Sequence, residues 1–231
     1  MIQHLDKKFK DLLIWHPHLQ SYENLKRFEE AIQKKGGGAL VWGFVDGTFR
    51  GFQRPTKRQQ DWYSGYYGAH GFKFQAIVTP NGLVYSLIGP FHGKANDWSI
   101  FTSSSVPERI REVIGDRRIL YLYGDPAYHF LFGVMPPFKH ALGYRYLPRA
   151  ERAFNIRLSK VRISVEHAFG RTQSLWTYTA FSKQLSLTKQ PVAAFYRVAI
   201  LLTNLYTCIR GNQISQKFVC KPPSVEDYLC I

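Results

Sequence analysis

Cysteine is scarce in this chain of 231 residues, and its three copies, Cys208, Cys220 and Cys230, all lie near the C-terminal end. So small and odd a number argues against a disulfide framework and indicates a reducing compartment. The chain has no Cys-x-x-Cys pair, and no His-x-x-x-His pair falls on an expected helix, which argues against a zinc site. Internal repeats and low-complexity tracts are absent as well.

Long apolar runs are also missing. The first residues contain no apolar core of the kind that a secretion signal needs. The longest apolar stretch, 191–209, is interrupted by Arg197 and Asn204 and is too short and too polar for a membrane span. We therefore expect a buried helix there and no association with a membrane.

Acidic residues are few: 16 Asp and Glu stand against 31 Lys and Arg, for a net charge of +15. An excess of this size indicates an anionic partner, with nucleic acid first and a membrane surface second. A solvated basic face without a specific partner, or binding to RNA, remains an alternative. With 45% hydrophobic and 16% aromatic residues, the chain has enough apolar side chains to bury a sizeable core.

The order of apolar patterns predicts an α/β domain. Residues 2–35 show helical periodicity in two segments separated by Pro17, and Gly36–Gly38 ends this helical prelude. Three successive strands, the second and third joined by a hairpin turn, then predict an antiparallel meander, and a helical crossover leads to a fourth strand beside the first. The expected strands are 39–45, 72–78, 83–89 and 118–123. We divide the chain into an N-terminal helical segment (1–38), a main domain (39–210) and a C-terminal tail (211–231).

Two of these strands stop at an aspartate. Asp46 follows the apolar run of the first strand and precedes Gly47-Thr48, and Asp125 follows the fourth strand. The carboxyl ends of neighbouring parallel strands share one edge of a sheet, so the two carboxylates are expected to be neighbours. Because a turn cap is common for Asp before Gly, capping is the alternative explanation for Asp46.

A third acid, Glu166, lies on a helix expected from about Arg152 to Ser174. It sits beside Val165 at the edge of the apolar stripe, so we expect it where the helix meets the sheet rather than fully in solvent. Arg162 precedes it by four positions, and an ion pair between the two is the alternative explanation. Three converging carboxylates repel one another unless a cation lies between them, and Mg²⁺ or Mn²⁺ prefers such oxygen ligands.

Basic residues surround these acids in the sequence. One set lies in or beside a long insertion after the first strand, interleaved with Phe, Trp and Tyr, as nucleic-acid-contacting loops often are. A mobile basic hairpin with its aromatics packed beneath it explains this set equally well. The expected DNA-binding residues are Arg50, Arg54, Lys57, Arg58 and Lys73, and, along the late helix, Arg149, Arg152, Arg157, Lys160, Arg162 and Arg171.

Several segments resemble the DDE endonuclease domain of Harbinger (PIF-type) transposases and their domesticated derivatives, most closely the fungal branch. The resemblance covers roughly residues 40–231, and it rests on the order and spacing of the motifs rather than on any single one. The matching segments are 45–48, 70–75, 89–90 with Gly93, 96–97, 123–128, 137–138, 154–155, Ser159, Arg162, 165–166, 169–170, 201–204, 222–223 and 228–229.

The resemblance implies an RNase H-like fold: a mixed five-stranded sheet flanked by helices. It implies a metal-dependent DNA endonuclease or transposase that cleaves phosphodiester bonds and can join strands, with a location in the nucleus. Asp46, Asp125 and Glu166 match the family's metal-binding, catalytic triad for Mg²⁺ or Mn²⁺. Asp97 matches a further acidic position, which a helix cap explains equally well.

The chain departs from the family pattern in three places. Asn96-Asp97 replaces the usual His-Asp, Gln173 stands where a basic residue is frequent, and only about 40 residues precede the first strand, so the family's N-terminal DNA-binding helices are largely missing. The resemblance therefore implies a Myb-like DNA-binding partner protein, and it leaves oligomer formation open. The alternative function is a domesticated or truncated DNA-binding scaffold without nuclease activity.

Overall fold

A six-stranded mixed sheet forms the centre of the computed structural model, which describes residues 1–140, 146–180, 185–187 and 189–230. Strand β1 lies in the middle, antiparallel to β3 on one side and parallel to β5 on the other. β4 and the short β2 pair with β3, and the short β6 pairs with β5. The strands are β1 (Val41–Gly51), β2 (Tyr63–Ser64), β3 (Ala69–Val78), β4 (Val84–His92), β5 (Tyr121–Tyr123) and β6 (Val134–Met135).

Burial on both faces explains the composition of β1. Its first five residues, 41–45, are all buried, as expected for a strand with helices on both sides of the sheet. Phe44 lies opposite Val78 of β3 and opposite Tyr123 of β5, and all three side chains belong to the core. This continuous apolar packing fixes the position of Asp46 within the strand.

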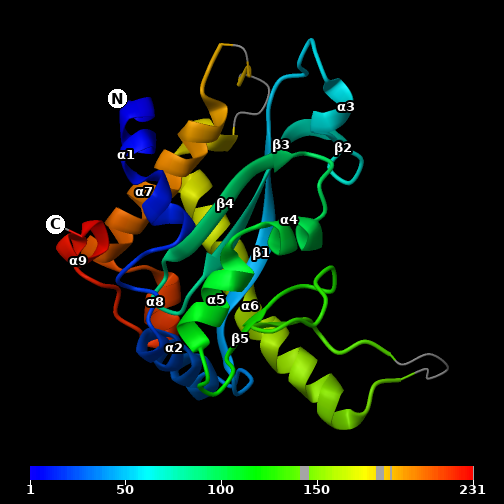
Figure 1. The fold of residues 1–231 in the computed structure, drawn as a ribbon, viewed down its shortest axis with the longest axis vertical. Coiled ribbons are helices and arrows are strands. Elements are labelled where there is room, and N and C mark those ends of the chain that lie inside the picture. Colours follow the sequence, from blue (N-terminus) through cyan, green and yellow to red (C-terminus); the bar gives the residue numbers. More distant parts are fainter. Residues whose placement is uncertain (141–145, 181–184, 188, 231) are drawn as a thin grey trace.

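Helices cover the two faces of the sheet (Figure 1). The ring of Phe44 contacts Phe218 of α8, whereas a Cβ on Gly47 would collide with Asp97 of α4. Positions 44 and 47 point to opposite faces of a strand, so α8 and α4 cover opposite faces. The helices are α1 (Ile2–Ile14), α2 (Tyr22–Lys34), α3 (Gln59–Trp62), α4 (Asp97–Ser103), α5 (Val106–Ile114), α6 (Arg149–Leu175), α7 (Val192–Arg210), α8 (Gln213–Phe218) and α9 (Val225–Leu229), with a 3-10 turn η1 (Thr177–Ala180).

The two ends of the chain meet on one side of the molecule (Figure 1). Arg197 of α7 pairs with Asp6 of α1 at 2.6 Å. The buried His16 donates from Nε2 to the Tyr228 carbonyl oxygen at 2.8 Å, because its Nδ1 accepts the backbone N–H groups of His18 and Leu19. The N-terminal helices are thereby fastened to the C-terminal segment.

The α/β class, the N-terminal helices, the antiparallel meander and the parallel placement of the first and fourth expected strands are confirmed. The sheet is compatible with an RNase H-like fold, and the short strands β2 and β6 bring its count to six among the described residues. One expectation was wrong: the first strand does not stop at Asp46, because β1 continues through it to Gly51. The tail beyond residue 210 contains the helices α8 and α9.

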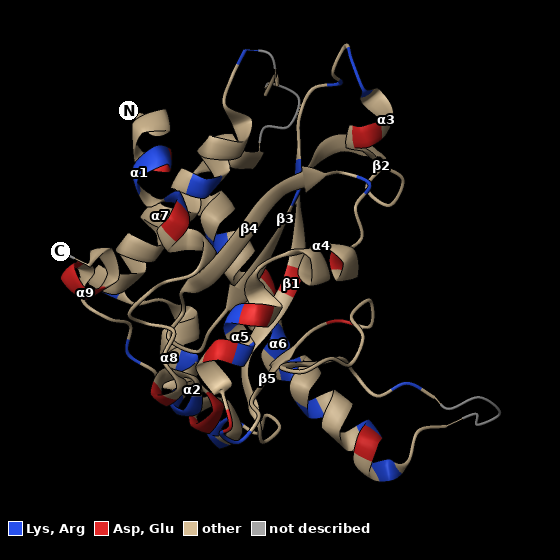
Figure 2. Ribbon diagram, in the orientation of Figure 1, with Lys and Arg blue, Asp and Glu red and all other residues tan. Residues whose placement is uncertain are grey.

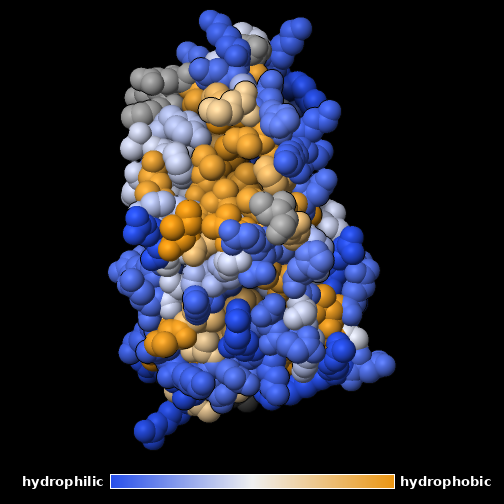
Figure 3. Space-filling model, turned by 90° about the vertical axis from the view of Figure 1, so that its left-hand side faces the viewer, coloured by the Kyte–Doolittle hydropathy of each residue, from blue (hydrophilic) through white to orange (hydrophobic). Residues whose placement is uncertain are grey.

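Helix α7 is the one helix of the described residues that is long and apolar enough to cross a membrane, but 56% of its apolar window is buried inside the protein. Burial of this kind is typical of a core helix and agrees with the expectation from the sequence. Its outer side is not fully covered, since Tyr206 and Ile209 are exposed. Figure 3 shows an apolar area on the face that carries α1 and α7.

Candidate active site

Asp46 lies inside β1, and its carboxylate is held from two directions. Oδ1 accepts the backbone N–H of Gly47 at 2.9 Å, and Oδ2 accepts from Arg162 of α6 at 2.7 Å. The side chain of Asp46 is 18% exposed, so the carboxylate is largely removed from water without being sealed off. A carboxylate at such depth needs a cation nearby, and the guanidinium of Arg162 supplies one.

Arg162 also connects Asp46 with the acid on α6. Its Nη1 lies 3.9 Å from Oε1 of Glu166, one helical turn further along. The sequence predicted this i,i+4 pair as an alternative to a metal ligand, and the structure contains it. The pair with Asp46, across 116 positions, is shorter by more than 1 Å and was not predicted.

Asp125 follows β5 after Gly124 and lies in electrostatic range of Asp46. Its Oδ1 accepts the backbone N–H of Ala127 at 2.9 Å, which fixes the turn after the strand. Since β1 and β5 are parallel neighbours, their chains carry Asp46 and Asp125 toward the same edge of the sheet. The structure thus brings together two acids that are 79 positions apart in the sequence.

The pKa of Asp46 is raised from 3.8 to about 6. Burial is the largest cause, and Arg162 opposes it by favouring the charged form. The negative charges of Asp125 and Asp97 add to the increase, while the hydrogen bond from Gly47 reduces it. Asp46 is therefore the carboxylate on which burial and like charges converge, a pattern frequent at functional sites.

Asp97 approaches β1 from the other face. A Cβ on Gly47 would lie 2.2 Å from Oδ1 of Asp97, so only glycine leaves space for this carboxylate. Lys73 of β3 donates to Asp97 at 3.0 Å. The helix cap is Asn96, whose side chain accepts from the backbone N–H of Ser99, so the alternative that capping explains Asp97 does not hold.

Two buried polar side chains complete the surroundings. Gln75 of β3 donates from Nε2 to the hydroxyl oxygen of Tyr128 at 2.8 Å and to the Asp97 carbonyl oxygen at 2.9 Å. The pKa of Tyr128 is well above its usual value because of burial first, and then because of the charges of Asp97, Asp46 and Asp125. The neutral hydroxyl of Tyr128 therefore lies in the electrostatic field of all three aspartates. Sequence reasoning assigned no role to Gln75 or Tyr128.

Glu166 is less enclosed than expected. Its side chain is 64% exposed, so the expectation that it leans into the junction of helix and sheet was wrong. The neighbouring stripe residues Val161 and Val165 are buried, whereas position 166 turns toward solvent. The link of Glu166 to Asp46 is the shared partner Arg162, whose Nη1 lies 3.9 Å from Oε1 of Glu166.

The chemistry of these donors fits a hard divalent cation, because carboxylate oxygens are the ligands that Mg²⁺ and Mn²⁺ prefer. Within the described ranges, however, no three His, Cys, Asp or Glu side chains form a group that could hold a metal ion as they are placed. Arg162 neutralises Asp46 in this arrangement. Binding of a metal by Asp46, Asp125 and Glu166 would thus require this guanidinium to move.

The expected DNA-binding residues divide into two groups. Seven are exposed, in the loop before α3 and on the first half of α6, where Figure 2 shows a row of basic positions: Arg54, Lys57, Arg58, Arg149, Arg152, Arg157 and Lys160. The other four are engaged inside the protein: Arg50 with Thr48 and Tyr196, Lys73 with Asp97, Arg162 with Asp46, and Arg171 with the Gly211 carbonyl oxygen. Internal pairing makes the second group poor contacts for DNA phosphates.

The aromatic residues of the insertion also divide. Phe52 and Trp62 pack with Phe72 in mutual edge-to-face contacts, as the alternative of a packed hairpin predicted. Tyr66 and Tyr67 stay exposed, and Tyr67 stacks on Phe49 with ring centroids 4.4 Å apart. The insertion thus combines a packed base with exposed aromatic rings.

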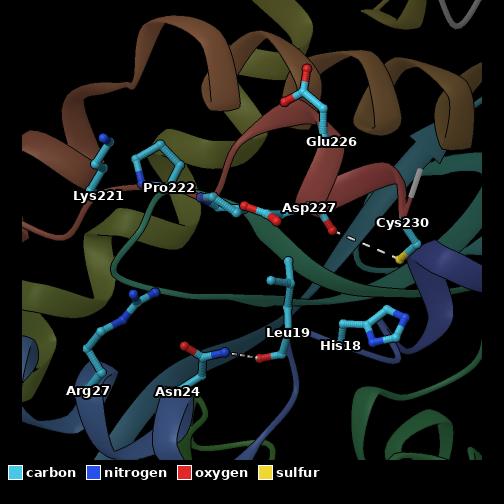
Figure 4. A pocket seen from close by; sticks show the side chains of 10 residues that line it. His18, Leu19, Asn24, Arg27, Lys221, Pro222, Glu226, Asp227 and Cys230 are labelled. Carbon is cyan, nitrogen blue, oxygen red and sulfur yellow. Dashed lines mark hydrogen bonds between the residues drawn. The ribbon is translucent and has the colours of Figure 1, made fainter.

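A separate cavity of about 590 Å³ lies between the α1–α2 connection and the C-terminal segment (Figure 4). Charges of both signs line it, among them Arg27, Lys221 and Asp227. None of its lining residues belongs to the carboxylate group or to the expected DNA-binding residues. It is therefore distinct from the site around Asp46.

The sheet therefore carries Asp46 within β1 and Asp125 shortly after the parallel neighbour β5, and α6 carries the third acid, Glu166. The chain belongs to the DDE superfamily endonuclease family, whose model matches residues 45–204. It is 28% identical over 124 residues to a probable transposase for insertion sequence element IS702 from Microchaete diplosiphon. That match covers 53% of this chain and 43% of the relative, so the chain spans less than half of the relative's length. No solved structure matches.

Proposed function

We propose that this protein is a metal-dependent DNA endonuclease of the transposase type, with Asp46, Asp125 and Glu166 as its catalytic, metal-binding residues and Asp97 as a secondary candidate. The observation that carries the proposal is the approach of Asp46 and Asp125 at one edge of the sheet, with Arg162 joining Asp46 to Glu166. Family membership supports the reaction class. The Harbinger-like, fungal type of transposase remains part of the proposal.

When bound, a pair of Mg²⁺ or Mn²⁺ ions supplies activation of the attacking oxygen and stabilisation of the leaving oxygen in phosphodiester cleavage. The residues of the chain hold the charges in place. Gly47 and Ala127 donate backbone N–H groups that orient Asp46 and Asp125. Arg162 keeps Asp46 ionised, and once displaced from it the guanidinium is available to a phosphate oxygen.

DNA is the substrate that fits the charge distribution. The exposed Arg149, Arg152, Arg157 and Lys160 form a row on α6, the helix that also carries Glu166. Contacts of this kind bind the phosphate backbone without reading sequence. Recognition of a target sequence then depends on another protein, for which we propose a Myb-like DNA-binding partner, in the nucleus. Strand joining and an oligomeric assembly belong to the same proposal.

The second candidate is a DNA-binding scaffold that does not cut. Two observations favour it: Arg162 engages Asp46, and the described residues contain no group of three His, Cys, Asp or Glu side chains that could hold a metal ion. The two candidates differ in whether the protein cleaves DNA. Cleavage by the nuclease requires a divalent metal and the three carboxylates, whereas the scaffold binds DNA without either and does not cleave it.

Nicking of supercoiled plasmid in Mg²⁺ or Mn²⁺ separates the candidates. Wild type is expected to nick the plasmid only with metal, and Asp46→Asn and Glu166→Gln are expected to be inactive while still binding DNA. Asp116→Asn and Glu108→Gln are matched controls, because both acids are exposed and lie outside the site. Salt-sensitive binding by wild type without metal-dependent nicking establishes the scaffold instead. A parallel competition between DNA and RNA of equal length tests the preference for DNA.

A further inference from the structure

A second cavity of about 320 Å³ lies beside the carboxylates. The segments that follow the parallel strands β5 and β6 form it, so it opens at the edge of the sheet where Asp125 lies. Its walls are almost entirely aromatic and apolar, with one cation at the rim. They consist of Tyr128, His129, Phe130, Met135, Pro136, Pro137, Phe138 and Lys139.

Tyr128 belongs to both the cavity and the carboxylate site. Its side chain lines the cavity, while its hydroxyl accepts from Gln75 and lies in the field of Asp46, Asp97 and Asp125. Its backbone N–H donates to the Asp125 carbonyl oxygen at 3.1 Å. A ligand in this cavity would therefore lie close to a ligand bound at the carboxylates.

Two phenylalanines at this cavity are exposed on one side, while each contacts one ring of the protein: Phe130 lies 5.7 Å from Tyr121 and Phe138 lies 5.3 Å from Phe154 between ring centroids. Phe130 is 66% exposed and Phe138 is 43% exposed, although both side chains are large and apolar. The backbone of Phe138 is fixed by two hydrogen bonds with the Asn155 side chain on α6, and its ring packs edge to face against Phe154 of the same helix. Exposed aromatic rings on a fixed backbone, facing one cavity, are typical of a binding surface.

The charges around the cavity select its ligand. Lys139 belongs to the lining, α6 with its exposed basic row contacts Phe138 through Asn155, and the described lining contains no acidic side chain. A ligand with a flat apolar face attached to a phosphate satisfies both the rings and the cations. Single-stranded nucleic acid is bound in this way, with bases on aromatic rings and the backbone on basic residues.

We propose that this cavity receives one unstacked nucleobase of the DNA strand that is cut, next to the scissile phosphate. Phe130 and Phe138 stack on the base, Lys139 contacts its phosphate, and Tyr128 separates the base from the carboxylates. Enzymes that act on an extruded nucleotide gain selectivity from the cost of unstacking. The inference rests on the proposed function for the identity of the neighbouring phosphate, but the binding of a base can be measured without cleavage.

The test compares two short single-stranded probes of equal length and charge: a thymidine oligomer and an oligomer of abasic deoxyribose phosphates, both in EDTA. Wild type is expected to bind the thymidine oligomer more tightly. Phe138→Ala and, independently, Phe130→Ala are expected to weaken that binding about tenfold and to leave binding of the abasic oligomer unchanged. Tyr206→Ala is the matched control, since Tyr206 is as exposed as Phe138 but lies on α7.

Equal losses on both oligomers, or no loss in either phenylalanine variant, overturn the inference. Thermal unfolding of each variant identifies a loss of folding, and the use of two separate variants keeps the test valid if one is unstable. The result is independent of the nicking assay. Nicking that depends on Asp46 together with unchanged thymidine binding overturns the base pocket alone, and base-dependent binding without any nicking overturns the nuclease alone.

Discussion

Oδ2 of Asp46 on β1 and Nη2 of Arg162 on α6 lie 2.7 Å apart and join the centre of the sheet to the helix that covers it. This pair neutralises the acid that burial and two neighbouring carboxylates would otherwise protonate. The protonation state of Asp46 therefore depends on the opposing charges of Arg162 and Asp125. Each of these two charges can be removed by its own substitution.

The first prediction concerns this balance. Arg162→Ala is expected to raise the pKa of Asp46 above its value of about 6, because the opposing positive charge is lost. Asp125→Asn is expected to lower it, because a like charge is lost. Carbon-13 NMR of the Asp46 carboxyl in metal-free protein measures both shifts, and Arg157→Ala, an exposed residue of the same helix, is expected to cause neither. Shifts of the same sign in Arg162→Ala and Asp125→Asn would contradict the electrostatic account.

The second prediction concerns stability in a chelator. The folded protein holds the Asp46 proton up to about pH 6, whereas the unfolded chain releases it near pH 3.8. The contribution of Asp46 to the free energy of unfolding is therefore fully present below pH 3.8 and is lost as the pH rises through 6, by about 3 kcal/mol at most. Urea unfolding from pH 4 to pH 7 is expected to show this fall in wild type relative to Asp46→Asn. A difference between the two proteins that is constant with pH would refute it.

The third prediction concerns His16, which connects the α1–α2 segment to α9. Burial lowers its pKa from 6.5, and its hydrogen bonds require the neutral ring. Its contribution to stability is present above pH 6.5 and is lost as the pH falls below the lowered pKa, because the unfolded chain binds the proton first. His16→Ala is expected to lower the free energy of unfolding by about 2–4 kcal/mol at pH 7, since three backbone groups lose their partner. His18→Ala, an exposed neighbour, is expected to cost little, and equal losses in both variants would contradict the assignment.

The fourth prediction concerns Gly47. A Cβ at this position displaces the carboxylate of Asp97 and breaks its pair with Lys73, so Gly47→Ala is expected to cost about 1–3 kcal/mol. Gly170→Ala on α6 is the control, because its Cβ meets open space and alanine favours the helix. Thermal melting is expected to show a lower midpoint for the first variant and an equal or higher one for the second. If Gly170→Ala lowered the melting midpoint and Gly47→Ala did not, this explanation of Gly47 would be contradicted.

Much of the fold follows from local patterns. The continuous apolar run 41–45 predicts a central strand, and the spacing of Leu158, Val161 and Val165 predicts the buried stripe of α6. The end of β1 does not follow, because Asp46-Gly47 is a local turn signal. Pairing with β3, from Asp46 opposite Ala76 to Gly51 opposite Gly71, outweighs that signal and extends the strand.

The sequence pointed to the acidic residues of the candidate site, but it did not predict the partners of the basic residues. The i,i+4 spacing shows only that Arg162 can reach Glu166, whereas its shorter contact with Asp46 depends on how α6 crosses the sheet. Arg50 was expected in a DNA-binding loop, yet it is buried against Tyr196, 146 positions away. Partners separated by such distances are set by tertiary packing, which one sequence does not reveal.

The most direct measurement of the central claim is the rate of Mn²⁺-dependent nicking in Asp46→Asn, in Asp125→Asn and in the double variant. We expect each single substitution to reduce the rate at least about a hundredfold, and the double variant to be no slower than the singles, because the two carboxylates act as one unit. Asp116→Asn is expected to retain the wild-type rate. A wild-type rate in Asp46→Asn or Asp125→Asn would contradict the account.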